Sequence, residues 1–513
     1  MVRSDNKQLA INIFSNICIY VLQFVISFLL TPFIVKALGV EAYGFVGLSN
    51  NIISYTTLIT VALNAMASRF ISIEYHKNNI KKANVYFSSV FYGNLILGII
   101  MMAISSVIVL YLEYIVNIPE KLVSDVKILF ILLSVNAILG IITSVFNIAT
   151  FVKNRIDLRS IRTAIGNVLR ALSLLIVFSV FTPKLWLLGI SGMICTTYLI
   201  IVNIQYTRLL TPELKVNYKN FDWTSVVLLV TSGLWSLLTA MSDMFAKGFD
   251  LLLSNIFIDA TSMGLLSLSM SIPMILQSIC TSLSICFAPS WTLYYAKKDT
   301  VRLKYELAKS IRIMGFMSLL PLCILFSHGD IFYSLWLPTQ DYQMIYYLTV
   351  IGCLGYIFAF PLDSVWEIFT VTNKVKLAAI NLIVNNFMVF GIVMIGMFLT
   401  ESNIVKLFIL AGTRSFMIAF RSLTFLPLSG AKLVEMKAWA LYKPALKNLL
   451  SILIICIISI LFKNILFDST WLSFLVCCVI TIIIGVMVSA FVTLNSSDRE
   501  YLLSIIKAKL KIG

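Results

Sequence analysis

Long apolar runs, separated by short polar breaks, follow one another along the whole chain. A helix that rises about 1.5 Å per residue needs about 20 apolar residues to cross a hydrocarbon core of about 30 Å. The runs lack the two-residue alternation of barrel strands, so helices are expected, because they satisfy their own backbone groups in lipid. The fourteen expected membrane helices occupy residues 9–37, 44–68, 85–112, 126–150, 164–181, 185–207, 225–257, 262–288, 312–327, 344–371, 377–399, 404–427, 448–467 and 471–493.

The composition agrees with a chain that lies mostly within a membrane. Of its 513 residues, 60% are hydrophobic and 12% are charged, whereas a soluble fold carries about 25% charged residues. A soluble enzyme, a secreted disulfide scaffold and a disordered chain are therefore excluded as classes. The first apolar run is too long for the apolar region of a cleaved signal peptide.

The basic residues indicate how the helices are oriented. With a cytoplasmic N-terminus, 29 of the 39 lysines and arginines fall on the inner side of the membrane and seven on the outer side. This bias follows the positive-inside rule and predicts that both termini are cytoplasmic. We therefore interpret most of the net charge of +16 as topological, and we expect no nucleic-acid partner.

Two motifs recur at one offset of 220 residues. Residues 38–44 resemble residues 258–264, and residues 144–150 resemble residues 364–370. Since six helices separate the copies, the copies share an orientation and are related by a pseudo-two-fold axis along the membrane normal. We expect an all-α polytopic protein with a six-helix lobe at 1–207, a cytoplasmic linker at 208–223, a second six-helix lobe at 224–427, and an extra helix pair with a cytoplasmic tail at 428–513.

Polar residues within the first and seventh apolar runs are candidates for the transport site. Asp243, Lys247 and Asp250 are spaced to share one face of a helix. Asn16 and Gln23 belong to a similar polar stripe in the first run. Such groups usually face a bundle interior or a water-filled cavity. One hypothesis is that they line a cavity, with the carboxylates coupling ions and the others contacting substrate; the alternative is a self-neutralised pair packed between helices.

Further charges lie in the tenth, twelfth and fifth runs. Asp363 and Glu367 are four residues apart, and their repulsion favours protonation of one of them. This spacing suggests an ion-coupling site, or else a pair neutralised by the lysines that follow. Arg414 lies near mid-membrane, where an arginine is suited to phosphate oxygens. Arg421 and Arg170 are further candidates for anion binding, although either could extend towards the inner interface instead.

The sequence contains no sign of ATP-driven or metal-dependent chemistry. A Walker A motif requires a Gly-Lys pair, which does not occur. His76 and His328 are expected in loops far apart in the sequence, so we predict no metal site and no cofactor. The expected outer loops, including one at 328–343, are too short to hold a catalytic domain, and we expect a non-enzyme.

Several short motifs are similar to those of one transporter family. Residues 32–44 (PFIVKALGVEAYG), the junction from 250–254 to 263–267, and the segment 287–291 (FAPSW) resemble, in this order, the polysaccharide transporter branch of the MOP exporters, the Wzx-type O-antigen flippases. Ala260 and Thr261 depart from the usual glycine of the second motif.

The resemblance implies a flippase in the bacterial inner membrane that moves an undecaprenyl-pyrophosphate-linked oligosaccharide by ion-coupled alternating access. Its partners would be this polyprenyl-linked glycan and membrane lipid, with a polysaccharide polymerase and a chain-length regulator as further candidates. Two alternatives remain open. A drug or cation antiporter of the MATE kind would have an acidic cavity, and a membrane-embedded glycan polymerase would normally need a large outer loop.

Overall fold

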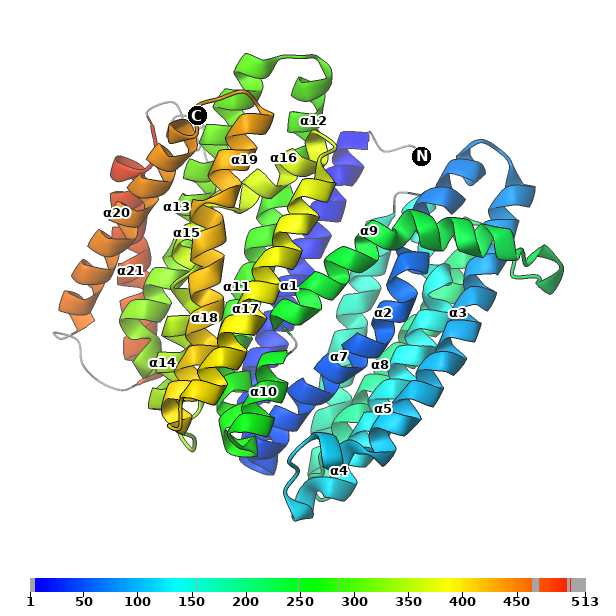
Figure 1. Cartoon of the computed structure of the whole chain (residues 1–513), viewed down its shortest axis with the longest axis horizontal. Coiled ribbons are helices and arrows are strands. Elements are labelled where there is room, and N and C mark those ends of the chain that lie inside the picture. The colour runs from blue at the N-terminus through cyan, green and yellow to red at the C-terminus, as the bar shows by residue number, and fades with distance from the viewer. Residues whose placement is uncertain are drawn as a thin grey trace. The chain divides into compact units, whose positions relative to one another are not determined.

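The computed structural model describes residues 5–153, 155–247, 249–285, 287–463, 470–495 and 499. Every regular element in these ranges is helical, which confirms the expected all-α class. The chain forms two compact units, Met1–Ser267 and Leu268–Gly513, and Figure 1 shows the helices of each.

The first unit contains the helices up to α10 and the first turns of α11. Their bounds are α1 (Asp5–Leu38), α2 (Val40–His76), α3 (Ile80–Leu110), α4 (Leu112–Ile115), η1 (Glu120–Leu122), α5 (Val123–Ile142), η2 (Thr143–Asn147), α6 (Ile148–Val152), α7 (Ile156–Val180), α8 (Leu187–Leu210), η3 (Tyr218–Asn220), α9 (Trp223–Lys247), α10 (Phe249–Phe257) and α11 (Ala260–Ile285).

The second unit contains the rest of α11 and all later helices. Their bounds are α12 (Ala288–Ala296), α13 (Thr300–Trp336), α14 (Tyr342–Cys353), α15 (Tyr356–Leu362), η4 (Asp363–Val365), α16 (Trp366–Val371), α17 (Val375–Leu399), α18 (Asn403–Leu423), α19 (Phe425–Leu433), α20 (Trp439–Lys463) and α21 (Trp471–Val492).

Each expected apolar run coincides with a helix or a helix series. Within the described ranges, twelve helices are long and apolar enough to cross a membrane, or thirteen if the bent pair α14–α16 is one span. The expected single run 225–257 is divided into α9 and α10, and the span in α9 covers Trp223–Ser242. The expected run 344–371 is bent by 45°. The chain is therefore a multi-pass membrane protein.

Helix α2 is the centre of the first unit, packing against α3, α5 and α9. Its buried residues Leu63, Ala67 and Ile71 join a core with Phe87 of α3 and Leu229 of α9. Because α9 packs onto α2, residues 224–267 belong to the first compact unit. The sequence suggested a boundary earlier, in the linker at 208–223. The assignment of six helices to each repeat stays a prediction.

Residues that are 220 positions apart in the sequence meet in the first unit. The Thr261 hydroxyl donates a hydrogen bond of 2.9 Å to the Glu41 carboxylate. Gly44 and Gly264 approach so closely that a Cβ on Gly44 would lie 2.9 Å from the Gly264 Cα. Equivalent positions of two copies meet in this way where a local two-fold axis passes between them. The contact supports the repeat that was inferred from residues 38–44 and 258–264.

The second pair of repeat segments also has matching backbone conformations. Residues 143–147 form a 3₁₀ helix, η2, followed directly by the short α6. Residues 363–365 form a 3₁₀ helix, η4, followed directly by the short α16. Since the two series begin 220 residues apart, the offset describes local structure as well as sequence.

The linker between the expected lobes is bound to α3, because side chains of α3 form hydrogen bonds with backbone amides and carbonyls of the linker. Asn84 donates to the carbonyl of Glu213 at 2.8 Å and accepts from the amide of Lys215 at 2.7 Å. The Ser89 hydroxyl accepts from the amide of Asp222 at 3.0 Å and donates to its carbonyl at 3.2 Å. The linker therefore lies along α3 in a fixed conformation.

Asp222 ends the linker and caps the N-terminus of α9. Its carboxylate accepts hydrogen bonds from the hydroxyls of Ser225 at 2.6 Å and Thr224 at 2.7 Å, and from the backbone amides of both residues. These bonds favour the charged form and lower the pKa of Asp222 to about 2. The cap fixes the residue at which α9 begins.

Candidate functional site

Four of the predicted site residues come together in the second unit. Asp363 of η4 interacts electrostatically with Arg421 of α18 and with Glu367 of α16, and Arg414 lies two turns before Arg421 on the same helix. Tyr356 of α15 connects them, because it interacts electrostatically with both arginines and with Asp363. We call these five residues the acid–arginine cluster.

A close helix contact positions the cluster. The backbone amide of Gly355 donates to the hydroxyl of Ser415 at 2.7 Å. A Cβ on Gly355 would lie 2.1 Å from the Ser415 carbonyl oxygen, so only glycine permits this approach. The contact lies at the 45° bend between Cys353 and Tyr356. The bend therefore brings α15 against α18.

The carboxylate of Asp363 interacts with one neutral neighbour, a serine hydroxyl, and one positively charged neighbour, an arginine. Its Oδ2 accepts a hydrogen bond of 2.6 Å from the hydroxyl of Ser284 on α11. The guanidinium of Arg421 interacts with the same carboxylate electrostatically and lies 5.1 Å from the ring centre of Trp366. An arginine over an aromatic face gains cation–π stabilisation. Arg421 therefore lies beside Asp363 and Trp366, and its role in anion binding stays a prediction.

Tyr356 and Glu367 complete the cluster. The Tyr356 side chain is buried, and its hydroxyl donates a hydrogen bond of 3.2 Å to Gln277 of α11. Glu367 is half-buried and interacts electrostatically with Asp363. Arg414, Arg421 and Asp363 thus interact with Tyr356, and Glu367 interacts with Asp363, within apolar helices of the second unit. In such a group the carboxylates can bind a proton or a cation, and the guanidiniums can bind an anionic ligand.

The predicted site residues of the first unit whose side chains the structure describes, Gln23, Arg170 and Asp250, do not form a comparable group. Asp250 of α10 is buried and interacts electrostatically with Tyr55 of α2, whose ring stacks on Phe249. Gln23 of α1 and Arg170 of α7 are exposed. These positions support Asp250 as a buried charge but leave its role in ion coupling a prediction. The side chains of Asn16, Asp243 and Lys247 lie outside the described part of the structure.

A partly buried hydrogen-bonded triad in the first unit was not predicted. The amides of Asn64 on α2 and Asn94 on α3 bond to each other in both directions at 2.9 Å. The hydroxyl of Ser144 in η2 donates to the same Asn64 oxygen at 2.9 Å. In the sequence, the only indication of this triad was that two asparagines, Asn64 and Asn94, lie within apolar runs. The triad ties α2, α3 and η2 together near the repeat segment.

Two arginines were assigned to an inner loop and instead belong to a helix. Because α7 begins at Ile156, Arg159 and Arg162 lie in its first two turns. The expected start at residue 164 was too late, because the arginines masked the helical pattern. Their neighbours on α8 include two tyrosines that the sequence analysis did not consider.

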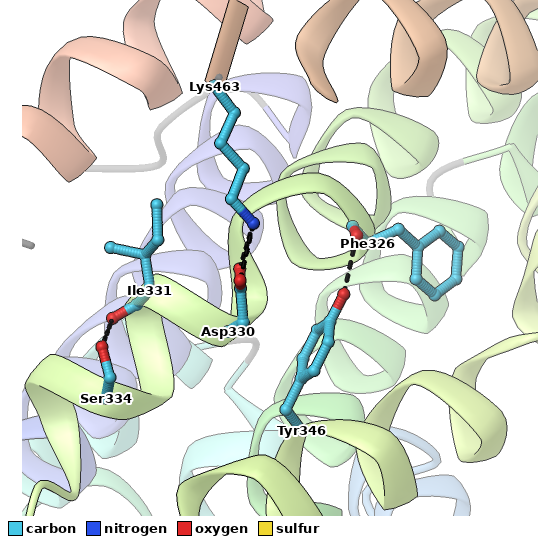
Figure 2. Close-up of polar contacts among 6 residues, drawn as sticks. All are labelled: Phe326, Asp330, Ile331, Ser334, Tyr346 and Lys463. Atoms are coloured by element: carbon cyan, nitrogen blue, oxygen red, sulfur yellow. Dashed lines mark hydrogen bonds and ion pairs between the residues drawn. The ribbon is translucent and has the colours of Figure 1, made fainter. Parts of the chain in front are cut away.

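The placement of His328 in an outer loop was wrong. Helix α13 continues to Trp336, and His328 is buried within it. Its Nε2 lies 3.0 Å from the Thr481 hydroxyl of α21. Two residues later, Asp330 pairs with Lys463 of α20 at 2.6 Å, as Figure 2 shows. Polar residues of α13 therefore contact both helices of the C-terminal pair, α20 and α21. The expected outer loop at 328–343 did not predict these contacts.

Tyr346 secures the next helix to the same end of α13. Its hydroxyl donates a hydrogen bond of 2.9 Å to the carbonyl of Phe326 (Figure 2). Lys463, Asp330 and Tyr346 thus gather three helices, α20, α13 and α14, around one turn. We interpret this group as structural, since each member has a partner within it.

Comparison with known sequences shows similarity to a bacterial membrane protein. The uncharacterized membrane protein EpsK of Bacillus subtilis (strain 168) is 30% identical over 373 residues, which are 72% of this chain and 73% of EpsK. No family model matches the chain.

Solved structures of membrane transporters have the same fold. The lipid II flippase MurJ in an inward closed conformation has a TM-score of 0.71 and 12% identity, over 92% of this chain and 98% of that one. An inward-facing multidrug resistance MATE family transporter of the MOP superfamily has a TM-score of 0.63 and 14% identity, over 81% of this chain and 95% of that one. These likenesses establish a MOP-type transporter fold.

Proposed function

Because the chain belongs to the family of the Bacillus subtilis membrane protein EpsK and has a MOP-type fold, we propose that it is a flippase for a lipid-linked oligosaccharide. The proposed substrate is an undecaprenyl-pyrophosphate-linked repeat unit of O-antigen or a similar surface polysaccharide. It would move across the bacterial inner membrane from the cytoplasmic face, with both termini of the protein in the cytoplasm.

The observation that carries this proposal is that Arg414 and Arg421, on an apolar helix of the second unit, both interact electrostatically with the buried Tyr356. A pyrophosphate presents several anionic oxygens, which the planar donor fork of an arginine binds well. A cationic drug would gain nothing from two guanidiniums. The cluster thus favours the flippase over a MATE-like antiporter, although both share the fold.

In the proposed cycle, Asp363 and the substrate compete for Arg421. In the state described here, Arg421 interacts with the carboxylate of Asp363. Uptake of a proton by Asp363 cancels this attraction and frees the guanidinium to bind a phosphate oxygen. Loss of the proton restores the pairing and weakens the hold on the anion. Proton movement and substrate release would thereby be coupled during alternating access.

The test is transport by variants of the full chain reconstituted in liposomes, with a fluorescent undecaprenyl-pyrophosphate-linked glycan as substrate. We expect Arg421→Gln and Arg414→Gln each to lower the transport rate by about 10-fold or more, since a charge-assisted hydrogen bond is worth about 1.5–3 kcal/mol. Arg302→Gln is the control, because Arg302 is exposed in the first turn of α13.

Asp363→Asn separates coupling from binding. We expect it to retain glycan binding and to lose the dependence of transport on a proton gradient. Full transport by both arginine variants would refute the anion assignment, and transport of an organic cation with no need for a polyprenyl pyrophosphate would favour the antiporter.

A further inference from the structure

The seam between α7 and α8 carries arginines that are separate from the acid–arginine cluster. Arg159, Arg162 and Arg170 are spaced by three and eight residues along α7, which places them on one side of the helix. Helix α7 packs against α8 along this side, where the Gly166 position would bring a Cβ within 3.0 Å of the Cys195 Sγ. The arginines therefore follow the line where the two helices meet.

Two tyrosines of α8 hold Arg162 in place. Its Nε donates to the hydroxyl of Tyr206 at 3.0 Å, and its Nη1 donates to the hydroxyl of Tyr198 at 3.4 Å. Each phenol oxygen accepts from the guanidinium, so each phenol keeps its own proton to donate elsewhere. Arg162 and the two tyrosines therefore form a set of hydrogen-bond donors around one positive charge.

The positive charge at this seam has little internal compensation. Arg155 is neutralised by Asp157, with a fork of two hydrogen bonds of 3.0 Å. Arg159 and Arg170 are exposed, and neither has an acidic partner in the part of the chain that the structure describes. Arg159 precedes Arg162 by three residues, a spacing that brings side chains about 5–6 Å apart at Cβ. The two guanidiniums can therefore reach one ligand.

The surroundings of these donors are apolar and exposed. Large aliphatic side chains with more than a third of their surface accessible follow three of these donors by one helical turn: Ile165 after Arg162 on α7, and Ile201 after Tyr198 and Leu209 after Tyr206 on α8. A soluble anion would find no use for such a surface, whereas hydrocarbon chains pack against it. Basic groups between membrane helices commonly bind lipid headgroups.

We propose that Arg159 and Arg162, with the hydroxyls of Tyr198 and Tyr206, bind the phosphate headgroup of a membrane lipid at the α7–α8 seam. The guanidiniums and phenol protons contact the phosphate oxygens, and the acyl or prenyl chain lies on the exposed aliphatic side chains. The proposal does not depend on transport. A glycerophospholipid and a polyprenyl phosphate share this chemistry, and either satisfies the site.

Native mass spectrometry of the detergent-solubilised full chain measures the binding directly. The probes are dioleoyl phosphatidylglycerol, undecaprenyl phosphate, dioleoylglycerol (which lacks phosphate) and inorganic phosphate. We expect tight binding of one or both phosphate lipids and weak binding of the other two probes. Arg162→Gln should raise the dissociation constant for the bound phosphate lipid about 10-fold or more.

Three further variants separate the site from general charge attraction. Arg162→Lys keeps the charge but loses the fork, and it should weaken binding nearly as much. Tyr206→Phe keeps the ring and should weaken binding about 3-fold. Arg302→Gln is a matched control that removes the same charge from an arginine lying 5.3 Å from the ring centre of Tyr294, and it should bind like the wild type.

The outcomes divide cleanly. Preference for phosphatidylglycerol identifies a phospholipid site, preference for undecaprenyl phosphate identifies a site for the carrier lipid, and both support the proposal. Equal losses in Arg162→Gln and Arg302→Gln would overturn it, as would equal binding of dioleoylglycerol. Equal affinity for inorganic phosphate would show that the site takes a free anion and would overturn the lipid assignment.

Discussion

The contact between α9 and α2 permits a sharp test of how tightly these helices pack. A Cβ on Gly233 of α9 would lie 1.9 Å from the carbonyl oxygen of Ala62 on α2. The usual distance between a carbon and a carbonyl oxygen in contact is about 3.3–3.6 Å. Gly233→Ala therefore requires the helices to separate by roughly 1.5 Å at this point. The obstacle is backbone, so no side-chain rotation relieves it.

The expected effect is a clear loss of stability. Overpacking of this kind costs about 1–3 kcal/mol, and separation of the helices also weakens the core around Leu63 and Leu229. We expect the thermal unfolding midpoint in detergent to fall by roughly 1–5 °C. Gly140→Ala on α5 is the matched control, because a Cβ there would meet no atom within 4 Å.

Alanine forms helices better than glycine by about 0.8–1 kcal/mol, so Gly140→Ala should unfold at the wild-type temperature or above it. The measurement is tryptophan fluorescence or light scattering on heating, with both variants in the same detergent. Equal midpoints for Gly233→Ala and Gly140→Ala would refute the inferred helix contact.

Three other predictions concern polar groups. Asp222→Ala should lower the free energy of unfolding by about 1 kcal/mol at neutral pH. Because folding lowers the Asp222 pKa from 3.8 to about 2, the stabilisation by this carboxylate is complete above pH 4 and declines as the pH falls towards 2. The difference in unfolding free energy from the wild type should therefore shrink in acid, and a constant difference would contradict the cap. Asp330→Lys and Lys463→Asp should each lower the unfolding midpoint, while the double exchange should recover most of the loss, as measured by a double-mutant cycle; additive losses would show that the pair of Figure 2 contributes nothing. Asn94→Leu should destabilise the protein by about 1–3 kcal/mol in chemical unfolding, because it removes both hydrogen bonds between the Asn64 and Asn94 amides, and an unchanged midpoint would count against the triad.

The membrane class and the positions of the helices could be predicted because they depend on local properties. Apolar length is sufficient to locate a helix in lipid, and each run from 9–37 to 471–493 coincides with a helix or a helix series. The ends of helices were harder to place, since charged residues continue several helices beyond the apolar core. Thus α13 reaches from Thr300 to Trp336, although its expected run covered only 312–327.

The sequence identified residues of the candidate site, but it could not predict how these residues are arranged in space. Asp363, Glu367, Arg414 and Arg421 stood out because charges are costly within apolar runs. That they gather around Tyr356 depends on the bend near Gly355 and its contact with Ser415. This contact joins residues 60 positions apart in the sequence, and no local pattern reports it.

Uncharged partners escaped prediction for the same reason. The Asn64–Asn94 pair and the tyrosines beside Arg162 become significant only when their helices are brought together. His328 was misplaced because a histidine near a glycine and an aspartate resembles the start of a loop. In the structure these polar residues instead face α20 and α21.

The packing of α9 on α2 has a consequence for how the protein is made. Ala62 and Gly233 touch, yet the ribosome adds about 170 residues between them. At about 5–20 residues per second, α2 waits roughly ten to thirty seconds in the membrane before its partner emerges. During synthesis the face of α2 that later receives α9 must be shielded by lipid, by earlier helices or by the insertion machinery. The first unit cannot be completed until residue 267 of the 513 residues has been made, so its assembly cannot finish before about half of the chain has been translated.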